Sequence, residues 1–233
     1  MPYRRLPNTD KARLKAMETA VDKMRRSDSY VPVIAPDLLV RVERLLWQFQ
    51  SANRTYLANL DQQLAFSRSD KYQTRLKTAR MYVSHFIMVF NMCVKRKEFK
   101  VSDRSYYSMP EDMSEVPDLS TDVAVLRWCE NVIRGERERT GRGGIPVYNP
   151  SVAKLAVHYD LFNELYKEHK RLKSLTDESL NAVAVMRPEA DALILDVWNS
   201  IEKFFSNLSG EERLDACRSY GVIYYYRKGE KTD

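Results

Sequence analysis

The chain has 233 residues, of which 44% are hydrophobic, 30% are charged and only seven are glycine, with a net charge of +6. This composition is that of a globular protein rich in helix, and its longest apolar runs are too short to span a bilayer. Three cysteines, odd in number and set among apolar neighbours, predict reduced core thiols. We therefore expect a soluble cytoplasmic protein with no signal peptide, no membrane segment and no disulfide framework.

Helical periodicity dominates the first half of the chain. Thr9 follows a proline and suits an N-cap, and Asp10 suits the first turn because a helix N-terminus attracts negative charge. The elements expected here are a helix from Thr9 to about Arg26, a helix of roughly 30 residues from Asp37, a helix from a polar turn at 67–70 to about Lys97, and an irregular crossover from Lys100 to Pro117.

The second half is expected to repeat this order. Pro188 suits a first helical turn because its missing N–H has no partner there, and Ser209 begins a Ser-x-x-Glu capping box. The expected elements are a helix from Thr121 to about Arg139, a Gly-rich loop over 141–144, a helix from Pro150 to about Leu175, a helix from Pro188 to about Asn207, a short helix from Ser209 to about Ser219, and an extended segment over 222–226.

Two proline-bracketed linkers indicate an internal duplication, because Pro32 and Pro36 match Pro146 and Pro150 at an offset of 114 residues. The same offset pairs Val83 with Val197, Ile87 with Ile201, Phe90 with Phe204, Val94 with Leu208, and Arg104-Ser105-Tyr106 with Arg218-Ser219-Tyr220. These apolar positions share one helix face, so we expect the two third helices to bury the same stripe. Chance alignment of helices with one period is the alternative.

We therefore predict an all-α fold formed by tandem duplication of a three-helix unit. Residues 1–117 and 118–233 are the expected repeats, packed as one composite bundle with a short extended C-terminal segment. Phe90 and Phe204 are expected to be buried in equivalent places.

Positive charge gathers in the first predicted repeat, which holds 21 Lys and Arg against 13 Asp and Glu, whereas the second holds 17 against 19. A candidate anion patch at the end of the third helix consists of Lys95, Arg96, Lys97, Lys100, Arg104 and Tyr106. Clustered cations can hold phosphates while a base stacks on the ring. We favour the alternative, in which these cations match the C-terminal end of the helix dipole.

No arrangement of residues in the sequence predicts catalysis or metal binding. Bundle metal sites use Glu-x-x-His pairs, and the residues three before His85, His158 and His169 are not glutamate. His85 has apolar neighbours and is expected in the core. The loop at 141–144 lacks the strand, the lysine and the hydroxyl residue of a phosphate-binding loop. We predict no catalytic residue, no metal and no cofactor.

Five segments together resemble an uncharacterised family of bacterial all-helical proteins that has no assigned function. They are Arg4 to Asp10, Tyr82 to Ile87, Pro146 to Pro150, Arg187 to Asp191 and Tyr220 to Val222. The resemblance spans nearly the full length. It implies a helical fold and a bacterial cytoplasmic setting, and it brings no activity or site residue.

From the sequence we predict a non-catalytic protein that acts by binding a protein partner or by self-association. One reason is charge, since the basic repeat of one molecule can meet the acidic repeat of another. Binding of nucleic acid or another polyanion by the first repeat is the alternative. An enzyme with a site in a groove between the repeats is the third hypothesis.

Overall fold

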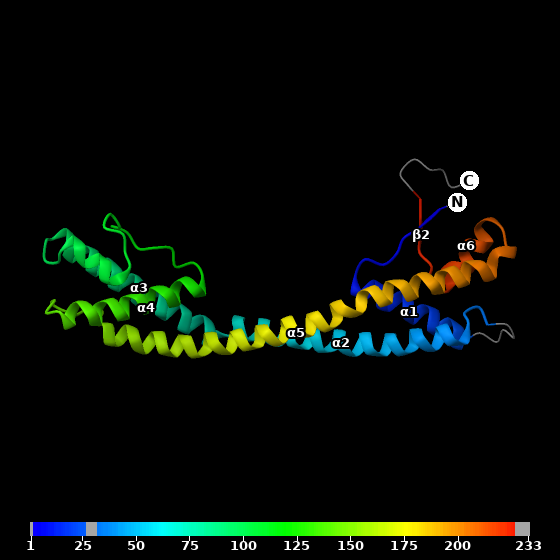
Figure 1. Ribbon diagram of the computed structural model, residues 1–233, viewed down its shortest axis with the longest axis horizontal. Coiled ribbons are helices and arrows are strands. Elements are labelled where there is room, and N and C mark those ends of the chain that lie inside the picture. Colours follow the sequence, from blue (N-terminus) through cyan, green and yellow to red (C-terminus); the bar gives the residue numbers. More distant parts are fainter. Residues whose placement is uncertain (1, 27–31, 227–233) are drawn as a thin grey trace. The chain divides into compact units, whose positions relative to one another are not determined.

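The computed structural model describes residues 2–26 and 32–226, and it is all-α, as predicted, apart from one pair of two-residue strands (Figure 1). Its elements are β1 (Tyr3–Arg4), α1 (Asp10–Arg25), α2 (Pro36–Arg68), α3 (Asp70–Lys95), η1 (Val101–Tyr107), α4 (Asp122–Gly141), α5 (Val152–Phe204), η2 (Phe205–Asn207), α6 (Gly210–Ser219) and β2 (Tyr224–Tyr225). Within the described residues, no helix combines the length and the apolar character that crossing a membrane requires.

Threonine caps open α1 and α4, which begin where the sequence predicts them. The side chain of Thr9 accepts a hydrogen bond from the backbone N–H of Ala12 at 3.2 Å, and Thr121 accepts one from Ala124 at 3.2 Å. Each bond satisfies a donor that the first helical turn leaves open. The capping box predicted at Ser209 is wrong, because α6 begins there without a side-chain capping bond.

The two long helices predicted for the second half are one continuous helix, α5, with Pro188 in its interior. The expected break between Leu175 and Pro188 is therefore wrong. A proline inside a helix removes one backbone hydrogen bond and normally costs about 3 kcal/mol. Pro188 lies on the exposed face, where water can satisfy the freed carbonyl, while Val183 and Ala190 on the other face are buried.

Packing divides the chain into two compact units, which are unit 1 (Met1–Leu60 and Leu175–Asp233) and unit 2 (Asp61–Ser174). These units do not follow the predicted repeat boundaries at 1–117 and 118–233. The end of α5 packs in unit 1 against α1 and α2, and α3 packs in unit 2 against α4 and the start of α5. The third helix of each half therefore belongs to the unit whose first two helices come from the other half.

The core of unit 1 lies between α1, the first part of α2 and the last part of α5, which run side by side in Figure 1. Phe49 and Trp198 are fully buried there. Cys217 of α6 is buried in the same cluster, and burial raises the pKa of its thiol. The last part of α5 thus supplies the apolar stripe that closes unit 1.

The core of unit 2 lies between α3, α4, η1 and the first part of α5. Phe86, Phe90 and Tyr107 are fully buried, and the rings of Phe90 and Tyr107 lie 4.6 Å apart. Cys129 is buried as well, and burial raises the pKa of its thiol to about 12. The thiol of Cys129 is therefore protonated at neutral pH.

The stripes matched at the offset of 114 agree in part. Buried residues at this offset include Leu76 with Ala190, Ala79 with Leu193, Val83 with Val197, and Ile87 with Ile201. The match fails at Phe204, which is 36% exposed at the end of α5, whereas Phe90 is fully buried. Phe204 packs edge-on against Phe205 where the helix changes into η2, so its predicted burial is wrong. Tandem duplication stays a prediction.

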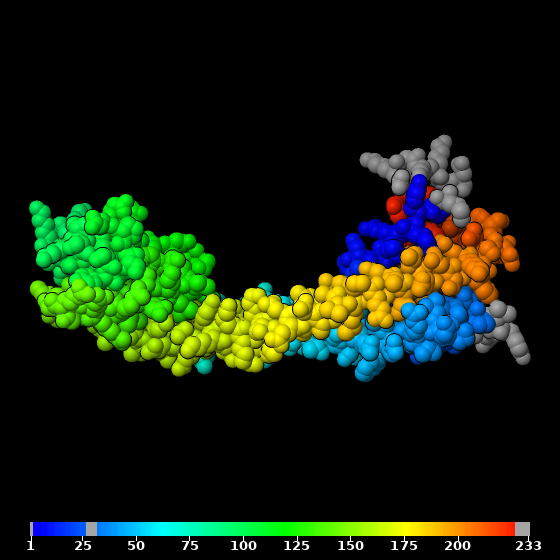
Figure 2. Space-filling view, viewed as in Figure 1, coloured from blue at the N-terminus to red at the C-terminus, as the bar shows by residue number. Residues whose placement is uncertain are grey.

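The extended C-terminal segment forms, as predicted, and pairs with the start of the chain. β1 and β2 are antiparallel, with Tyr3 opposite Tyr225. They meet the last part of α5, and the blue and red atoms rise above the orange helix in Figure 2. Two bonds fix them there, from the Arg4 guanidinium to Asn199 at 2.7 Å and from the Tyr224 hydroxyl to Glu202 at 2.7 Å.

Candidate protein-interaction surface

Methionines line the outer face of α3. Met81, Met88 and Met92 follow one another at intervals of seven and four residues, which places them on one side of the helix, and each is between 43% and 50% exposed. They border an open groove of about 410 Å³, called the Met groove below. The residues that line the Met groove are Met81, Tyr82, His85, Met88, Val89, Met92, Asn149 and Pro150.

The inner face of α3 explains why these methionines point outward. Ala79, Val83 and Phe86 are fully buried in the core of unit 2, and they fix the rotation of the helix about its axis. Thioether side chains are flexible and polarizable, so a row of exposed methionines can adapt to the shape of an apolar partner. The Met groove is therefore a preformed apolar surface with an adaptable lining.

A buried polar network anchors the linker that forms one wall of the Met groove. Glu136 accepts a hydrogen bond from the backbone N–H of Val147 at 2.7 Å, and Arg139 donates to the carbonyl of Ile145 at 2.6 Å. Both charged side chains are nearly inaccessible, with 1% and 3% exposed. Because buried polar groups are costly unless paired, these bonds hold the linker firmly against α4.

The same network ties η1 to α4. The hydroxyl of Tyr107 donates to Glu136, and the guanidinium of Arg139 donates to the Tyr107 oxygen at 2.8 Å and to Glu136 at 2.9 Å. Burial, with the hydrogen bond to Glu136, raises the pKa of Tyr107 above its ordinary value. Gly135 allows this close approach, because a Cβ there would lie 2.5 Å from the carbonyl oxygen of Tyr106. Sequence reasoning missed these residues, whose only signal is a Glu and an Arg three apart.

Exposed cations lie at both ends of the Met groove. Lys77 is one turn before Met81, and Lys95 and Arg96 are one turn after Met92. Arg96 reaches Glu98 only at 3.9 Å, and both side chains are more than half exposed. The rim of the groove along α3 is therefore positively charged.

Only part of the predicted anion patch is accessible. Lys95, Arg96, Lys97 and Lys100 are exposed, as a phosphate site requires. Arg104 is instead 7% exposed, with bonds to the carbonyl of Glu111 at 2.6 Å and to Asn91 at 3.3 Å. Its place in the patch is therefore wrong, because the guanidinium closes the turn after η1 and cannot reach a ligand.

Tyr106 does not offer a free ring beside the exposed cations. It is half-buried, and the guanidinium of Arg142 lies 5.3 Å from its ring centroid. The two residues line a second hollow of about 340 Å³ together with Lys100 and the backbone of residues 143–144. The ring of Tyr106 is therefore already in contact with a guanidinium of the same chain.

His85 and His158 of unit 2 have different settings. His85 is exposed in the Met groove, so its predicted core position is wrong. His158 stacks on Tyr82 at 4.3 Å, and burial, with the nearby cations Arg75 and Lys154, lowers the pKa of its imidazole. The part of the chain that the structure describes has no group of three His, Cys, Asp or Glu side chains that could hold a metal ion.

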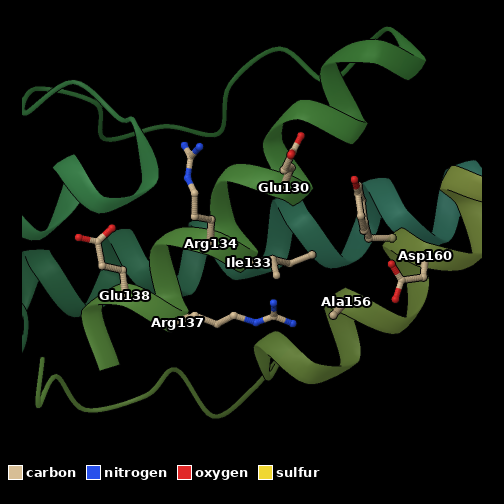
Figure 3. Close-up of a pocket in the computed structure, with 8 residues that line it drawn as sticks. Glu130, Ile133, Arg134, Arg137, Glu138, Ala156 and Asp160 are labelled. Carbon is tan, nitrogen blue, oxygen red and sulfur yellow. The ribbon is translucent and has the colours of Figure 1, made fainter. Parts of the chain in front are cut away.

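A hollow of about 600 Å³ lies between α4 and α5 of unit 2 (Figure 3). Ile133 and Ala156 give it an apolar floor, and the guanidinium of Arg137 reaches across it in Figure 3. Burial and the carboxylates of Glu130 and Asp160 raise the pKa of Tyr159, which keeps its hydroxyl protonated. This hollow combines both signs of charge, whereas the Met groove is apolar with a basic rim.

Comparison of the chain with known protein families, with curated proteins and with solved structures found no match. The resemblance to an uncharacterised family of bacterial helical proteins therefore stays a prediction. What the Met groove can bind follows from its own shape and charge.

Proposed function

We propose that the protein is a non-catalytic interaction protein whose Met groove binds the apolar face of a partner helix. The observation that carries this proposal is the row of Met81, Met88 and Met92, each close to half exposed on a helix whose other face is fully packed. Contiguous exposed apolar surface on a folded protein marks an interaction site. Exposed methionine is typical of grooves that receive amphipathic helices.

The size of the groove suits about three turns of helix. Met81 and Met92 are eleven residues apart on α3, which at 1.5 Å per residue is about 16 Å. A partner with apolar side chains at intervals of three, four and seven residues can place them between the methionines. The groove therefore favours a helix over a single inserted side chain.

The charge of the rim selects an acidic partner. Lys77, Lys95 and Arg96 lie at the two ends of the groove, and complementary charge speeds association and disfavours basic partners. A polyanion such as nucleic acid is the second candidate for the same cations. The burial of Arg104 and the contact of Arg142 with Tyr106 argue against it. Arg104 cannot reach a phosphate, and the ring of Tyr106 is not free to stack on a base.

Two synthetic peptides test the proposal. One is an amphipathic helix with leucine on one face and glutamate elsewhere, and the other replaces every glutamate with lysine. By fluorescence anisotropy, the glutamate peptide is expected to bind at least about tenfold more tightly than the lysine peptide at low salt. NMR of labelled methionine methyl groups should show the signals of Met81, Met88 and Met92 shifting on binding.

A matched pair of variants separates the Met groove from general surface effects. Met88→Glu places a charge in the groove and should abolish peptide binding, whereas Val157→Glu changes a still more exposed apolar residue of α5 in the same unit and should not. If wild type and Met88→Glu bind the glutamate peptide equally, the Met groove is not the binding site. Tighter binding to oligonucleotides than to the peptide would favour the polyanion function instead.

A further inference from the structure

The two units differ in what covers the outer face of the third helix. When Val83 and Ile87 are matched to Val197 and Ile201, the face with Met81, His85 and Met88 corresponds to Leu195, Asn199 and Glu202 of α5. In unit 1, Asn199 and Glu202 bind Arg4 and Tyr224 of the two strands. This face takes a second segment in unit 1, and in unit 2 the apolar Met groove lies open in its place.

Unit 1 exposes an apolar anchor of the kind that the Met groove requires. Trp47 of α2 is 70% exposed, and Val40, seven residues earlier on the same helix, is 63% exposed. Trp128 and Trp198 are both buried, so Trp47 differs from the other tryptophans of the chain. Tryptophan is enriched among residues that dominate binding energy, and a largely exposed one marks a contact surface.

Acidic side chains border Trp47. Glu18, Asp22 and Glu43 line a shallow hollow of about 400 Å³ that Trp47 also borders. Arg25 pairs with Glu43 at 3.0 Å, so Glu18 and Asp22 supply the remaining negative charge. We call this surface, made of Val40, Trp47, Glu18, Asp22 and Glu43, the Trp47 face.

The Trp47 face and the Met groove match in spacing and charge. Val40 and Trp47 are separated by seven residues, and so are Met81 and Met88, which gives both pairs the same rise of about 10.5 Å along a helix. The carboxylates beside Trp47 complement Lys95 and Arg96 at the end of the groove. Arg44 lies four residues after Val40 and three before Trp47, so it shares this side of α2, and together with Arg25 it leaves the Trp47 face with a net charge of −1.

We propose that the occupant of the Met groove is the Trp47 face of a second copy of this chain. This inference rests on the proposed function and names its partner. Each copy would use two different surfaces, so the contact is heterologous. Association then continues to a third copy unless a ring closes, and the average mass should rise with concentration.

Sedimentation of two complementary variants tests the inference. Wild type should associate as its concentration rises, and Trp47→Ala should raise the dissociation constant at least about 30-fold, as for a dominant interface tryptophan. Met88→Glu, which alters the Met groove, should raise the dissociation constant by a similar factor. An equimolar mixture of the two variants should form a one-to-one complex, because one supplies an intact groove and the other an intact Trp47 face.

Controls use exposed apolar residues outside both surfaces. Val185→Ala in unit 1 and Val157→Glu in unit 2 change residues that are 76% and 56% exposed, and neither should alter association. Fluorescence gives an independent measurement, since Trp128 and Trp198 are buried and iodide quenching reports mainly on Trp47. Quenching should weaken as the concentration rises, in parallel with the increase in mass.

The outcomes distinguish this inference from the proposed function. If wild type stays monomeric up to about 1 mM, the weak end of specific contacts, while the glutamate peptide still binds the Met groove, the second copy is not the partner and the proposed function stands. Failure of both self-association and peptide binding overturns both. Association that survives Trp47→Ala, or a mixture without a one-to-one complex, overturns the inference.

Discussion

The two units have similar cores and different outer surfaces. Ala79, Val83 and Ile87 of α3 are buried in unit 2 at positions that match buried residues of α5 in unit 1. On the outer face of α5, Asn199 and Glu202 bind β1 and β2, whereas the outer face of α3 carries methionines and is open. In both units the buried stripe fixes the fold, whereas the face opposite to it differs between them.

The units also differ in how they use charge. In unit 1 the ion pairs lie at the edge of the core, with Arg13 bound to Asp191 at 2.8 Å and Arg187 bound to Asp10 at 2.9 Å. In unit 2 the pair of Glu136 and Arg139 is almost completely buried and also holds the linker. Charge therefore carries more of the local geometry in unit 2, where the Met groove forms.

The largest expected effect is the loss of the buried charge pair. Glu136→Gln keeps the shape of the side chain and leaves the guanidinium of Arg139 buried without its counter-charge, which should lower the free energy of unfolding by about 3–5 kcal/mol. Urea titration measures the change. Glu138→Gln, two residues along the same helix, breaks only an exposed pair with Arg142 and should cost less than about 1 kcal/mol. Equal effects of the two substitutions would show that burial does not distinguish the pairs.

The next prediction compares the stability effects of truncating Phe90 and Phe204, which the sequence alignment matches. Phe90 is fully buried against Tyr107, so Phe90→Ala should cost about 3–5 kcal/mol of unfolding free energy. Phe204 is 36% exposed, so Phe204→Ala should cost less than about 1.5 kcal/mol. Calorimetry of both variants checks the difference. A large loss at Phe204 would mean that the ends of α3 and α5 are packed alike after all.

Local sequence rules predicted most of the helices. They failed where tertiary packing determines whether a helix continues and which helices pack together. The starts of α1 and α4 followed from Thr9 and Thr121, because a cap depends only on neighbouring residues. Pro188 suggested a helix start, yet α5 runs through it, because the buried side of the helix continues and the proline faces solvent. The reciprocal packing of the third helices has no local signal, so the unit boundaries could not be predicted.

The candidate site was predictable only in part. The exposed cations Lys95 and Arg96 were named from the sequence, and their place beside an apolar groove was not. The spacing of Met81, Met88 and Met92 is visible in the chain, but a methionine stripe on a helix can equally be core. Its exposure is known only once the neighbouring stripe is seen to be buried.

Removing a helix cap should lower the free energy of unfolding by a smaller amount, and by a similar amount in each unit. Thr9→Ala and Thr121→Ala each remove a capping bond of 3.2 Å, and each should lower the free energy of unfolding by about 1 kcal/mol. Ser209→Ala removes no capping bond and should have almost no effect. Urea titration of the three variants compares them. A clear loss at Ser209 would contradict the capping geometry of α6.

The smallest expected effect on stability concerns the basic rim of the Met groove. Changing Lys95 and Arg96 of the rim, together with the neighbouring Lys97, to alanine should cost only a few tenths of a kcal/mol each, because exposed charges at a helix end interact weakly in water. Binding of the glutamate peptide should weaken about three- to tenfold and lose most of its salt dependence. A control triple change of Lys154, Lys167 and Lys170 to alanine removes the same charge from exposed positions of α5 in unit 2 and should preserve peptide binding.

Binding of oligonucleotides tests whether the rim instead binds a polyanion. We expect wild type to bind single- and double-stranded oligonucleotides no more tightly than about 10 μM at physiological salt, within the usual range of non-specific binding. A phosphate site on Lys95, Arg96 and Lys97 would instead give tight binding whose slope of log affinity against log salt falls by roughly 2–3 in the triple variant. The peptides and the oligonucleotides test the same groove and the same rim. If the triple variant no longer binds nucleic acid but still binds the glutamate peptide, these cations bind phosphate. They would then play no part in selecting the partner of the methionines.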